Sequence, residues 1–301
     1  MSTGELADGP IVVGTDGSEK GREAVRWAAD LAARRQRTLR IVHAANSLRG
    51  FSVDPVFSRD VFERLNAEGK SVLEAARQEA ETTGSSADIE VEMSSGDEIS
   101  VLIEESRSAA MLVLGAEGVG GFAGMLAGST AIAVTSHAAC PVVVIRRRED
   151  GTPAPENGPV VVGVDGSPVS EEATAVAFQE ASLRGVKLVA VNAMLDLEYD
   201  SALNEALVYF EGEPKKQHHE ILVAEQLAGW KEKYPDVVVE RVIERDRPRR
   251  QLLEWSDTAS LLVVGSRGRG GFRGLLLGST SQAMIHHARC PVMVVRHERH
   301  R

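Results

Sequence analysis

The chain is poor in cysteine and in aromatic residues. Its 301 residues include two cysteines, too few for a disulfide framework. Only three tryptophans, three tyrosines and seven phenylalanines are present, which leaves little material for stacking the bases of a single-stranded nucleic acid. The composition therefore argues against a disulfide-rich scaffold and against a base-stacking protein.

Positive charge and long apolar runs are also scarce. Lys plus Arg number 34 against 44 Asp plus Glu, and the resulting net charge of −10 opposes attraction to nucleic acids and anionic membranes. No stretch approaches the roughly 18 to 20 apolar residues of a membrane span, and the first nine residues lack the basic and apolar regions of a secretory signal. We therefore expect a cytoplasmic protein that does not bind nucleic acid.

The sequence contains two copies of one unit. Residues 9–18 reappear as residues 158–167 with eight of ten positions identical, and residues 115–146 match residues 265–296. The segment between the copies is charged and rich in proline and glycine, as solvated linkers are. We predict a first domain over residues 1–148, a linker over 149–157 and a second domain over 158–301.

Within each copy, short β-branched runs alternate with helical patterns. The runs are apolar on both faces, which is typical of buried strands in a parallel sheet covered by helices. Helix starts are predicted at the capping-box pattern of residues 95–98 and at Ser167-Pro168. The fold class is therefore α/β, with one doubly wound, five-stranded parallel sheet per domain, and ligands are expected at the carboxyl edge of that sheet. The predicted strands are residues 11–14, 38–43, 89–93, 111–114 and 142–145, then 160–163, 187–191, 237–242, 261–264 and 292–295.

A glycine-dense segment follows the fourth predicted strand of each half, at residues 115–130 and 265–280. Bare backbone amides that end in Gly-Ser-Thr before a helix suit the binding of a phosphate. A flexible surface loop is the alternative, but the same glycine positions occur in both copies. No lysine precedes Ser129 or Ser279, and the glycine spacing differs from the dinucleotide-binding pattern, so neither standard phosphate loop is present.

An aspartate follows the first predicted strand of each half, as Asp16 and Asp165. Parallel strands bring this carboxylate to the same edge as the glycine segment. A carboxylate repels phosphates, so we expect it to accept hydrogen bonds from ribose hydroxyls or to help hold Mg²⁺. A turn-forming role before the following helix is the alternative.

These motifs resemble the universal stress protein family. The pattern of Gly, two residues, Gly, nine residues, Gly and then Ser or Thr resembles the family's ATP-binding motif, and the Val-Gly-x-Asp-Gly-Ser start and Cys-Pro-Val-x-Val-x-Arg end of each half are similar too. The resemblance covers both halves, as in tandem-domain actinobacterial or mycobacterial members. It implies a Rossmann-like sheet of order 3-2-1-4-5, similar to adenine nucleotide alpha hydrolases, and pairing of domains through the last strand.

The resemblance also implies where ATP binds, with the adenine held by main chain just after the second strand of each half. Together with the motifs, it gives the ATP-binding residues Asp16, Ala44, Gly115, Gly118, Gly128, Ser129, Thr130, Asp165, Ala193, Gly265, Gly268, Gly278, Ser279 and Thr280.

The two glycine segments differ in charge. If both bind ATP, we expect the first to bind more weakly by about 1 to 3 kcal/mol, the contribution of charge-assisted contacts. The differing positions are Glu117, Val119 and Ala123 in the first half and Arg267, Arg269 and Arg273 in the second.

Other reactive residues receive structural interpretations. Cys140 and Cys290 are predicted to be buried at strand entrances, and the basic run 245–250 is predicted to be a solvated helix entrance. Adjacent histidines at 218–219 and 286–287 point about 100° apart on a helix, so we do not expect them to share a metal ion.

The sequence therefore predicts an ATP-binding regulatory protein of stress or growth arrest. We expect one nucleotide site per domain, Mg²⁺ as a helper ion, no catalytic residue, slow hydrolysis at most, a homodimer and unidentified protein partners. His137 and His287 lie about two helical turns beyond Ser129 and Ser279, too far to activate them. The alternatives are an adenylating or phosphoryl-transfer enzyme on the same site and an interaction module without a ligand.

Overall fold

The structure is a computed structural model that divides into two compact units, Leu6–Ile145 and a second unit containing Arg146–Arg301. Side chains of residues 55–62, 205–216 and 218 lie outside the description. The structure describes residues 6–45, 55–84, 86–118, 127–148, 150–193, 205–244, 247–268 and 276–296.

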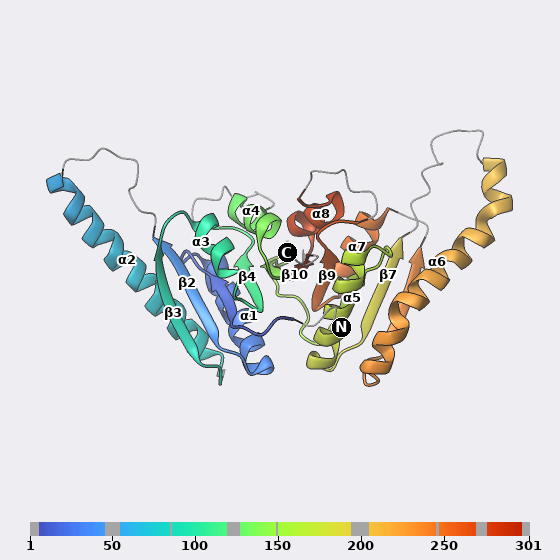
Figure 1. Ribbon diagram of the computed structural model, residues 1–301, viewed down its shortest axis with the longest axis horizontal. Coiled ribbons are helices and arrows are strands. Elements are labelled where there is room, and N and C mark those ends of the chain that lie inside the picture. Colours follow the sequence, from blue (N-terminus) through green and yellow to red (C-terminus); the bar gives the residue numbers. More distant parts are fainter. Residues whose placement is uncertain are drawn as a thin grey trace. The chain divides into compact units, whose positions relative to one another are not determined.

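The first unit alternates strands and helices along the chain (Figure 1). All of its strand pairs are parallel, in the order β3-β2-β1-β4-β5. Its elements are β1 (Ile11–Gly14), α1 (Glu19–Arg35), β2 (Leu39–Ala45), α2 (Pro55–Thr82), β3 (Ile89–Ser95), α3 (Glu98–Glu105), β4 (Met111–Gly115), α4 (Ser129–His137) and β5 (Val142–Ile145).

The second unit repeats this order with parallel pairs throughout, as β8-β7-β6-β9-β10. Both sheets confirm the doubly wound α/β class and the strand order 3-2-1-4-5 that the family resemblance implies. The elements are β6 (Val160–Gly163), α5 (Pro168–Arg184), β7 (Leu188–Ala193), α6 (Glu205–Lys233), β8 (Val239–Glu244), α7 (Pro248–Ser256), β9 (Leu261–Gly265), α8 (Ser279–His287) and β10 (Val292–Val295).

The strand order explains how helices cover both faces of each sheet. The first two crossovers run from β1 to β2 and on to β3, whereas the next two run in the opposite direction, from β3 past β1 to β4 and on to β5, so right-handed connections place the two helix pairs on opposite faces. In the first unit α1 contacts α2 and α3 contacts α4, and α1 packs on β1 and β4. The chain thus changes direction between β1 and β4, where open α/β sheets bind ligands.

Short polar signals set the helix starts. Ser18 and Ser167 cap α1 and α5 through hydrogen bonds from the amides of Gly21 and Ser170, at 3.0 and 3.2 Å. Pro168 follows Ser167 in the first turn, as the sequence predicts. The capping box predicted at residues 95–98 is wrong, because Ser95 ends β3; Asp97 instead caps α3 by accepting from the amide of Ser100 at 2.9 Å.

The prediction that all strands are buried on both faces is wrong for one edge strand of each sheet. β1 and β4, in the interior of the first sheet, are almost wholly buried, but most residues of β3 and β8 are exposed or half-buried. Val91 on β3 keeps 41% of its surface exposed, between the charged residues Glu90 and Glu92. An edge strand has a neighbour on one side only, and charges along it discourage pairing with another chain.

The second strand of each unit is longer than predicted. β2 continues to Ala45 and β7 to Ala193, because pairing with the outer strand continues there: Ala44 lies opposite Ser94, and Ala193 opposite Glu244. The expectation that Ala44 and Ala193 follow their strands is therefore wrong. Ala44 is the last residue but one of β2, and Ala193 is the last residue of β7.

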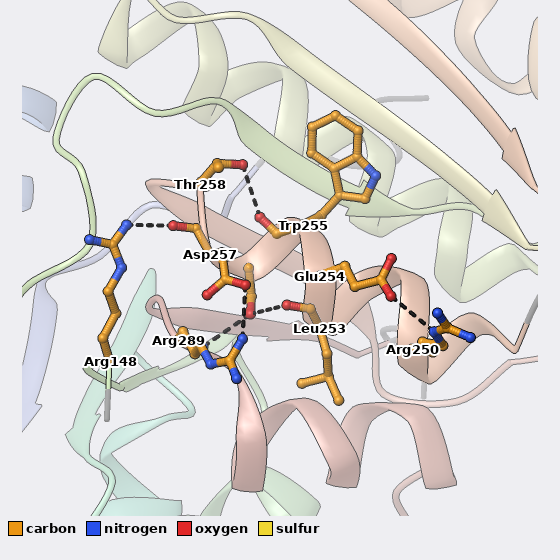
Figure 2. A network of polar contacts seen from close by, with 9 residues as sticks. Arg148, Arg250, Leu253, Glu254, Trp255, Asp257, Thr258 and Arg289 are labelled. Atoms are coloured by element: carbon orange, nitrogen blue, oxygen red, sulfur yellow. Dashed lines mark hydrogen bonds and ion pairs between the residues drawn. The ribbon is translucent and has the colours of Figure 1, made fainter. Parts of the chain in front are cut away.

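The segment between the sheets is held by hydrogen bonds of its own. The carbonyl of Arg148 accepts from the amide of Gly151 at 2.9 Å, and the side chain of Asp150 accepts from the amide of Thr152 at 2.9 Å. The guanidinium of Arg148 also donates to the carbonyl of Asp257, which caps the carboxyl end of α7 (Figure 2). A cation at that end is stabilised by the helix dipole.

Figure 2 shows what fixes that end of α7. Asp257 pairs with Arg289 at 2.8 Å, and the hydroxyl of Ser256 donates to Leu253 at 2.6 Å while accepting from the amide of Arg289 at 3.1 Å. The first unit repeats the serine part of this arrangement, since the Ser106 hydroxyl accepts from the amide of Ala139 at 2.9 Å. The turn before the last strand is thus anchored to a helix end in both copies.

Both cysteines lie at the entrance of a last strand, as predicted. Cys140 is 5% exposed and Cys290 is fully buried. Burial raises the pKa of the Cys140 thiol to about 12, and raises that of Cys290 as well. Because the thiolate is the reactive form, both groups are structural.

The thiols are therefore expected to resist modification in the folded protein. We expect the native protein at pH 8 to react with a thiol reagent at least about 100-fold more slowly than the same chain in denaturant, because burial lowers the thiolate fraction and keeps the reagent away from the sulfur. Mass spectrometry after timed labelling measures this. Rapid labelling of either cysteine under native conditions would contradict the buried placement.

Candidate functional site

In each unit the aspartate and the glycine segment meet at the carboxyl edge of the sheet. β1 and β4 are adjacent and parallel, and Asp16 follows β1 while residues 115–118 end β4 and begin the glycine segment. β6 and β9 place Asp165 and residues 265–268 in the same way. The residues that the sequence groups by spacing are therefore grouped in space.

The contact between aspartate and loop depends on a missing side chain. A Cβ atom on Gly118 would lie 2.6 Å from Oδ2 of Asp16, and one on Gly268 would lie 2.3 Å from Oδ2 of Asp165. Real Cβ atoms do not approach other heavy atoms so closely. The loop backbone passes directly over the carboxylate, so a ligand bound at the loop meets the carboxylate too.

The other oxygen of each aspartate organises the turn into the following helix. Oδ1 of Asp16 accepts from the amide of Ser18 at 3.0 Å. Oδ1 of Asp165 accepts from the amide of Ser167 at 2.9 Å and from its hydroxyl at 2.6 Å. The turn-forming role and the contact with the loop thus belong to the same side chain, one to each oxygen.

Gly115 packs closely against the start of a helix. Its Cβ would lie 2.9 Å from the carbonyl oxygen of Lys20 in the first turn of α1. Gly265 has a similar neighbour, since its Cβ would lie 3.0 Å from Cγ1 of Val169 in α5. Both glycines let the end of the fourth strand approach a helix start closely.

The far end of the glycine segment is tied back to its beginning. The amide of Gly128 donates to the carbonyl of Ala116, and the amide of Gly278 donates to that of Ser266, both at 2.7 Å. Residues 119–126 and 269–275 between these ends lie outside the part of the chain that the structure describes, and so do Val119, Ala123, Arg269 and Arg273.

Two helices begin where the glycine segments end. Gly128 and Gly278 occupy the N-cap positions of α4 and α8, so no capping side chain covers the first amides of these helices. Ser129 and Thr130, and likewise Ser279 and Thr280, form the first turn. Amides and hydroxyls at a helix start form a suitable site for an anion.

The described charges around the two sites have opposite signs. Glu117 and Arg267 occupy the same position and are both half-buried. In the first unit, Oε1 of Glu98 also lies 3.5 Å from the hydroxyl of Thr130, whereas α7 begins with Pro248 at the matching position. The electrostatic difference that the sequence suggests is therefore present close to the helix starts.

Ala44 and Ala193 direct their backbone groups toward the first strand of their sheets. The carbonyls of Thr38 and Val42 accept from the amides of Ile11 and Thr15, so the even-numbered residues of β2 face β1. Ala44 continues this series beyond the end of β1. Val191 accepts from Val164 in the second unit, which gives Ala193 the same direction.

The sequence analysis did not predict a polar side chain on the second strand of each unit, close to the carboxyl edge of the sheet. His43 on β2 and Asn192 on β7 sit at matching positions, and each bonds to the carbonyl that precedes the aspartate, as described below. A polar residue at the same repeat position near the end of both second strands was the available signal.

His137 and the described part of the basic run lie on or beside helices. Nδ1 of His137 bonds to the carbonyl of Ala133 in its own helix at 2.8 Å. In the described part of the basic run, Arg247 caps α7 and is exposed, and Arg250 pairs with Glu254 at 2.9 Å. Among the described residues, no three His, Cys, Asp or Glu side chains come together to hold a metal ion. No helix within the described ranges is long and apolar enough to cross a membrane.

Comparisons with known proteins agree with this architecture. The model of the universal stress protein family matches residues 9–146 and again residues 156–296. The chain is 42% identical over 289 residues to universal stress protein Rv2005c of Mycobacterium tuberculosis, covering 95% of this chain and 96% of that protein. It is 38% identical over 299 residues to universal stress protein Rv2623 of the same organism, covering 98% and 99%.

A solved structure shares the fold over nearly the whole length. The universal stress protein from Archaeoglobus fulgidus DSM 4304 matches with a TM-score of 0.68 and 20% identity, covering 95% of this chain and 98% of that one. With two matches of the family model along the sequence and relatives that match from end to end, the chain belongs to the universal stress protein family, as a member with two tandem domains.

Proposed function

We propose that this universal stress protein binds ATP, one molecule in each domain, at the edge where the glycine segment crosses the aspartate. The observation that carries the proposal is the contact of Gly118 with Asp16 and of Gly268 with Asp165, next to an uncapped helix start. The helix start offers amides to phosphates, and the carboxylate offers an acceptor to ribose hydroxyls. The proposed ligand residues are those given by the sequence.

The same carboxylates fit a role in holding Mg²⁺. Oδ1 of each aspartate is used in its turn, whereas Oδ2 faces the loop. Mg²⁺ is commonly held by one or two carboxylates together with phosphate oxygens and water. Asp16 and Asp165 would each supply one such ligand, and the ion would offset the repulsion between carboxylate and phosphates.

The proposed role is regulatory. In this proposal, bound ATP changes the surface that the protein offers to partner proteins during stress or growth arrest. We expect any hydrolysis to be slow, since the residues proposed for this site include none assigned to orient a water molecule. The domain boundaries, the cytoplasmic location and the homodimer stay predictions.

Calorimetric titration of the full chain with Mg-ATP tests the proposal. We expect two ATP molecules per chain, with unequal affinities. A chain stripped of nucleotide that releases no heat and retains no labelled ATP in equilibrium dialysis would contradict the proposal. Sustained release of ADP or AMP with an acceptor would favour the enzyme alternative.

A further inference from the structure

The carbonyl that ends the first strand is bonded by a side chain in both domains. In the first domain, the amide of Thr15 donates to Val42 at 3.0 Å, and the carbonyl of Thr15 accepts from Nδ1 of His43 at 2.8 Å. In the second, Val164 takes the place of Thr15: its amide donates to Val191 at 2.8 Å, and its carbonyl accepts from the Asn192 amide group at 2.7 Å. The second strand therefore fixes this residue through both of its backbone groups.

The partners determine which imidazole nitrogen carries a proton. A carbonyl can only accept, so Nδ1 of His43 carries hydrogen. Asn192 donates through its nitrogen to Val164, so its oxygen accepts, and it lies 2.7 Å from Nδ1 of His219 on α6. Nδ1 of His219 carries hydrogen as well. Asn192 is 2% exposed, so a missing partner for its oxygen would be costly.

The two domains make the same bond with a large and a small side chain in exchanged positions on the strand and the helix. In the first domain, His43 faces Gly69 of α2, where a Cβ would lie 3.2 Å from Cδ2 of His43 and 2.8 Å from the sulfur of Met93. In the second domain, the shorter Asn192 stands on the strand and the helix supplies His219. Gly69 and His219 are matching positions of the repeat. The first domain thus has an imidazole on the strand and a glycine on the helix. The second has a shorter amide side chain on the strand and an imidazole on the helix.

This side-chain bond replaces a backbone bond. In a continued parallel ladder, the acceptor of Thr15 would receive the amide of Ala44, because Ala44 is the next residue of β2 that faces β1. His43 takes this acceptor, and Asn192 takes that of Val164 in place of Ala193. The backbone of Ala44 and of Ala193 is thereby left for a ligand at the edge.

We propose that His43 and the Asn192–His219 pair are positioning residues of the two nucleotide sites. They bond the carbonyl at the end of the first strand, so that the amides of Ala44 and Ala193 are not used there and can bind the base of the nucleotide. This inference rests on the proposed function. It concerns the base end of the ligand, since Asp16 and Asp165 are held separately by their own turns.

The test transplants the arrangement of the second domain into the first. The parent chain carries Gly268→Ala, so that binding reports on the first site. His43→Asn is expected to weaken ATP binding about tenfold, because without a histidine at position 69 the new side chain lacks the partner that orients its amide toward the Thr15 carbonyl. Gly69→His alone crowds His43 and lowers the melting temperature. The double variant, which recreates the second domain's pair, is expected to bind ATP within about threefold of the parent.

Inorganic tripolyphosphate with Mg²⁺ is the matched probe, because it has no base. We expect its affinity to be the same in all four chains. Equal weakening of ATP and tripolyphosphate by His43→Asn would overturn the inference, and so would failure of the double variant to regain ATP affinity despite a restored melting temperature. A parent chain that binds tripolyphosphate but not ATP, or neither, would instead refute the proposed function on which the inference rests.

Discussion

Replacing Gly118 and Gly268 with alanine is expected to weaken ATP binding at each site about 10- to 100-fold while changing the stability of the fold little. The new methyl group would lie within 2.6 Å of Asp16 and 2.3 Å of Asp165, so each carboxylate must rotate away. Rotation breaks its contact with the ligand, and a hydrogen bond to a charged group contributes about 1.5 to 3 kcal/mol. The fold tolerates the movement, because an aspartate is short and its site opens to solvent at the sheet edge.

Titration calorimetry measures the affinities, and a thermal melt measures stability. Gly229→Ala is the matched control, since Gly229 lies in α6 and a Cβ there would meet nothing within 4 Å. Alanine inside a helix should raise stability by about 0.5 to 1 kcal/mol and leave ATP binding unchanged. If the double variant Gly118→Ala, Gly268→Ala binds ATP as the unmodified chain does, the glycine segments are not the binding site.

Exchanging Glu117 and Arg267 is expected to reverse the order of the two affinities. Both residues stand two positions after the fourth strand and are equally half-buried, so they differ in charge and not in place. Glu117→Arg replaces a repelling carboxylate with a cation beside the phosphates, and charge-assisted contacts of about 1 to 3 kcal/mol correspond to a gain of about 5- to 150-fold. Arg267→Glu is expected to weaken the second site by a similar factor.

The effect should shrink as salt is added, because exposed charges are screened within about 10 Å at 0.1 M salt. Glu81→Arg is the control for net charge. Glu81 lies in the last turn of α2, which runs opposite to the strands, and so belongs to the other edge of the sheet. An equal gain from Glu81→Arg would mean that overall charge, and not the local contact, sets the affinity.

Much of the fold could be predicted because its signals are local. Four-residue runs such as Ile11–Gly14 and Val142–Ile145 appear as strands with the predicted bounds, since β-branched residues buried on both sides favour this structure. The strand order came from the family resemblance. The exposure of β3 was not predictable from hydrophobicity alone, because whether a strand lies at the edge of a sheet depends on the order of all its strands.

Part of the candidate site was also predictable from local signals, and part was not. Glycine spacing and an early aspartate predicted which segments meet at the edge, because parallel strands bring their carboxyl ends together. The bonds from His43 and Asn192 could not be predicted from one residue each, since they depend on the size of a partner on a helix that lies close only in three dimensions. Comparing the two halves position by position would have marked the pair.

The exchange between His43 with Gly69 and Asn192 with His219 also limits how the two halves can recombine. A hybrid domain that joined the strand of the first half to the helix of the second would force two imidazoles into space for one. The opposite hybrid would leave the Asn192 oxygen buried without the proton that His219 supplies. A crossover that falls between the second strand and the following helix is therefore expected to destabilise the hybrid domain, whereas one that keeps each pair together is not.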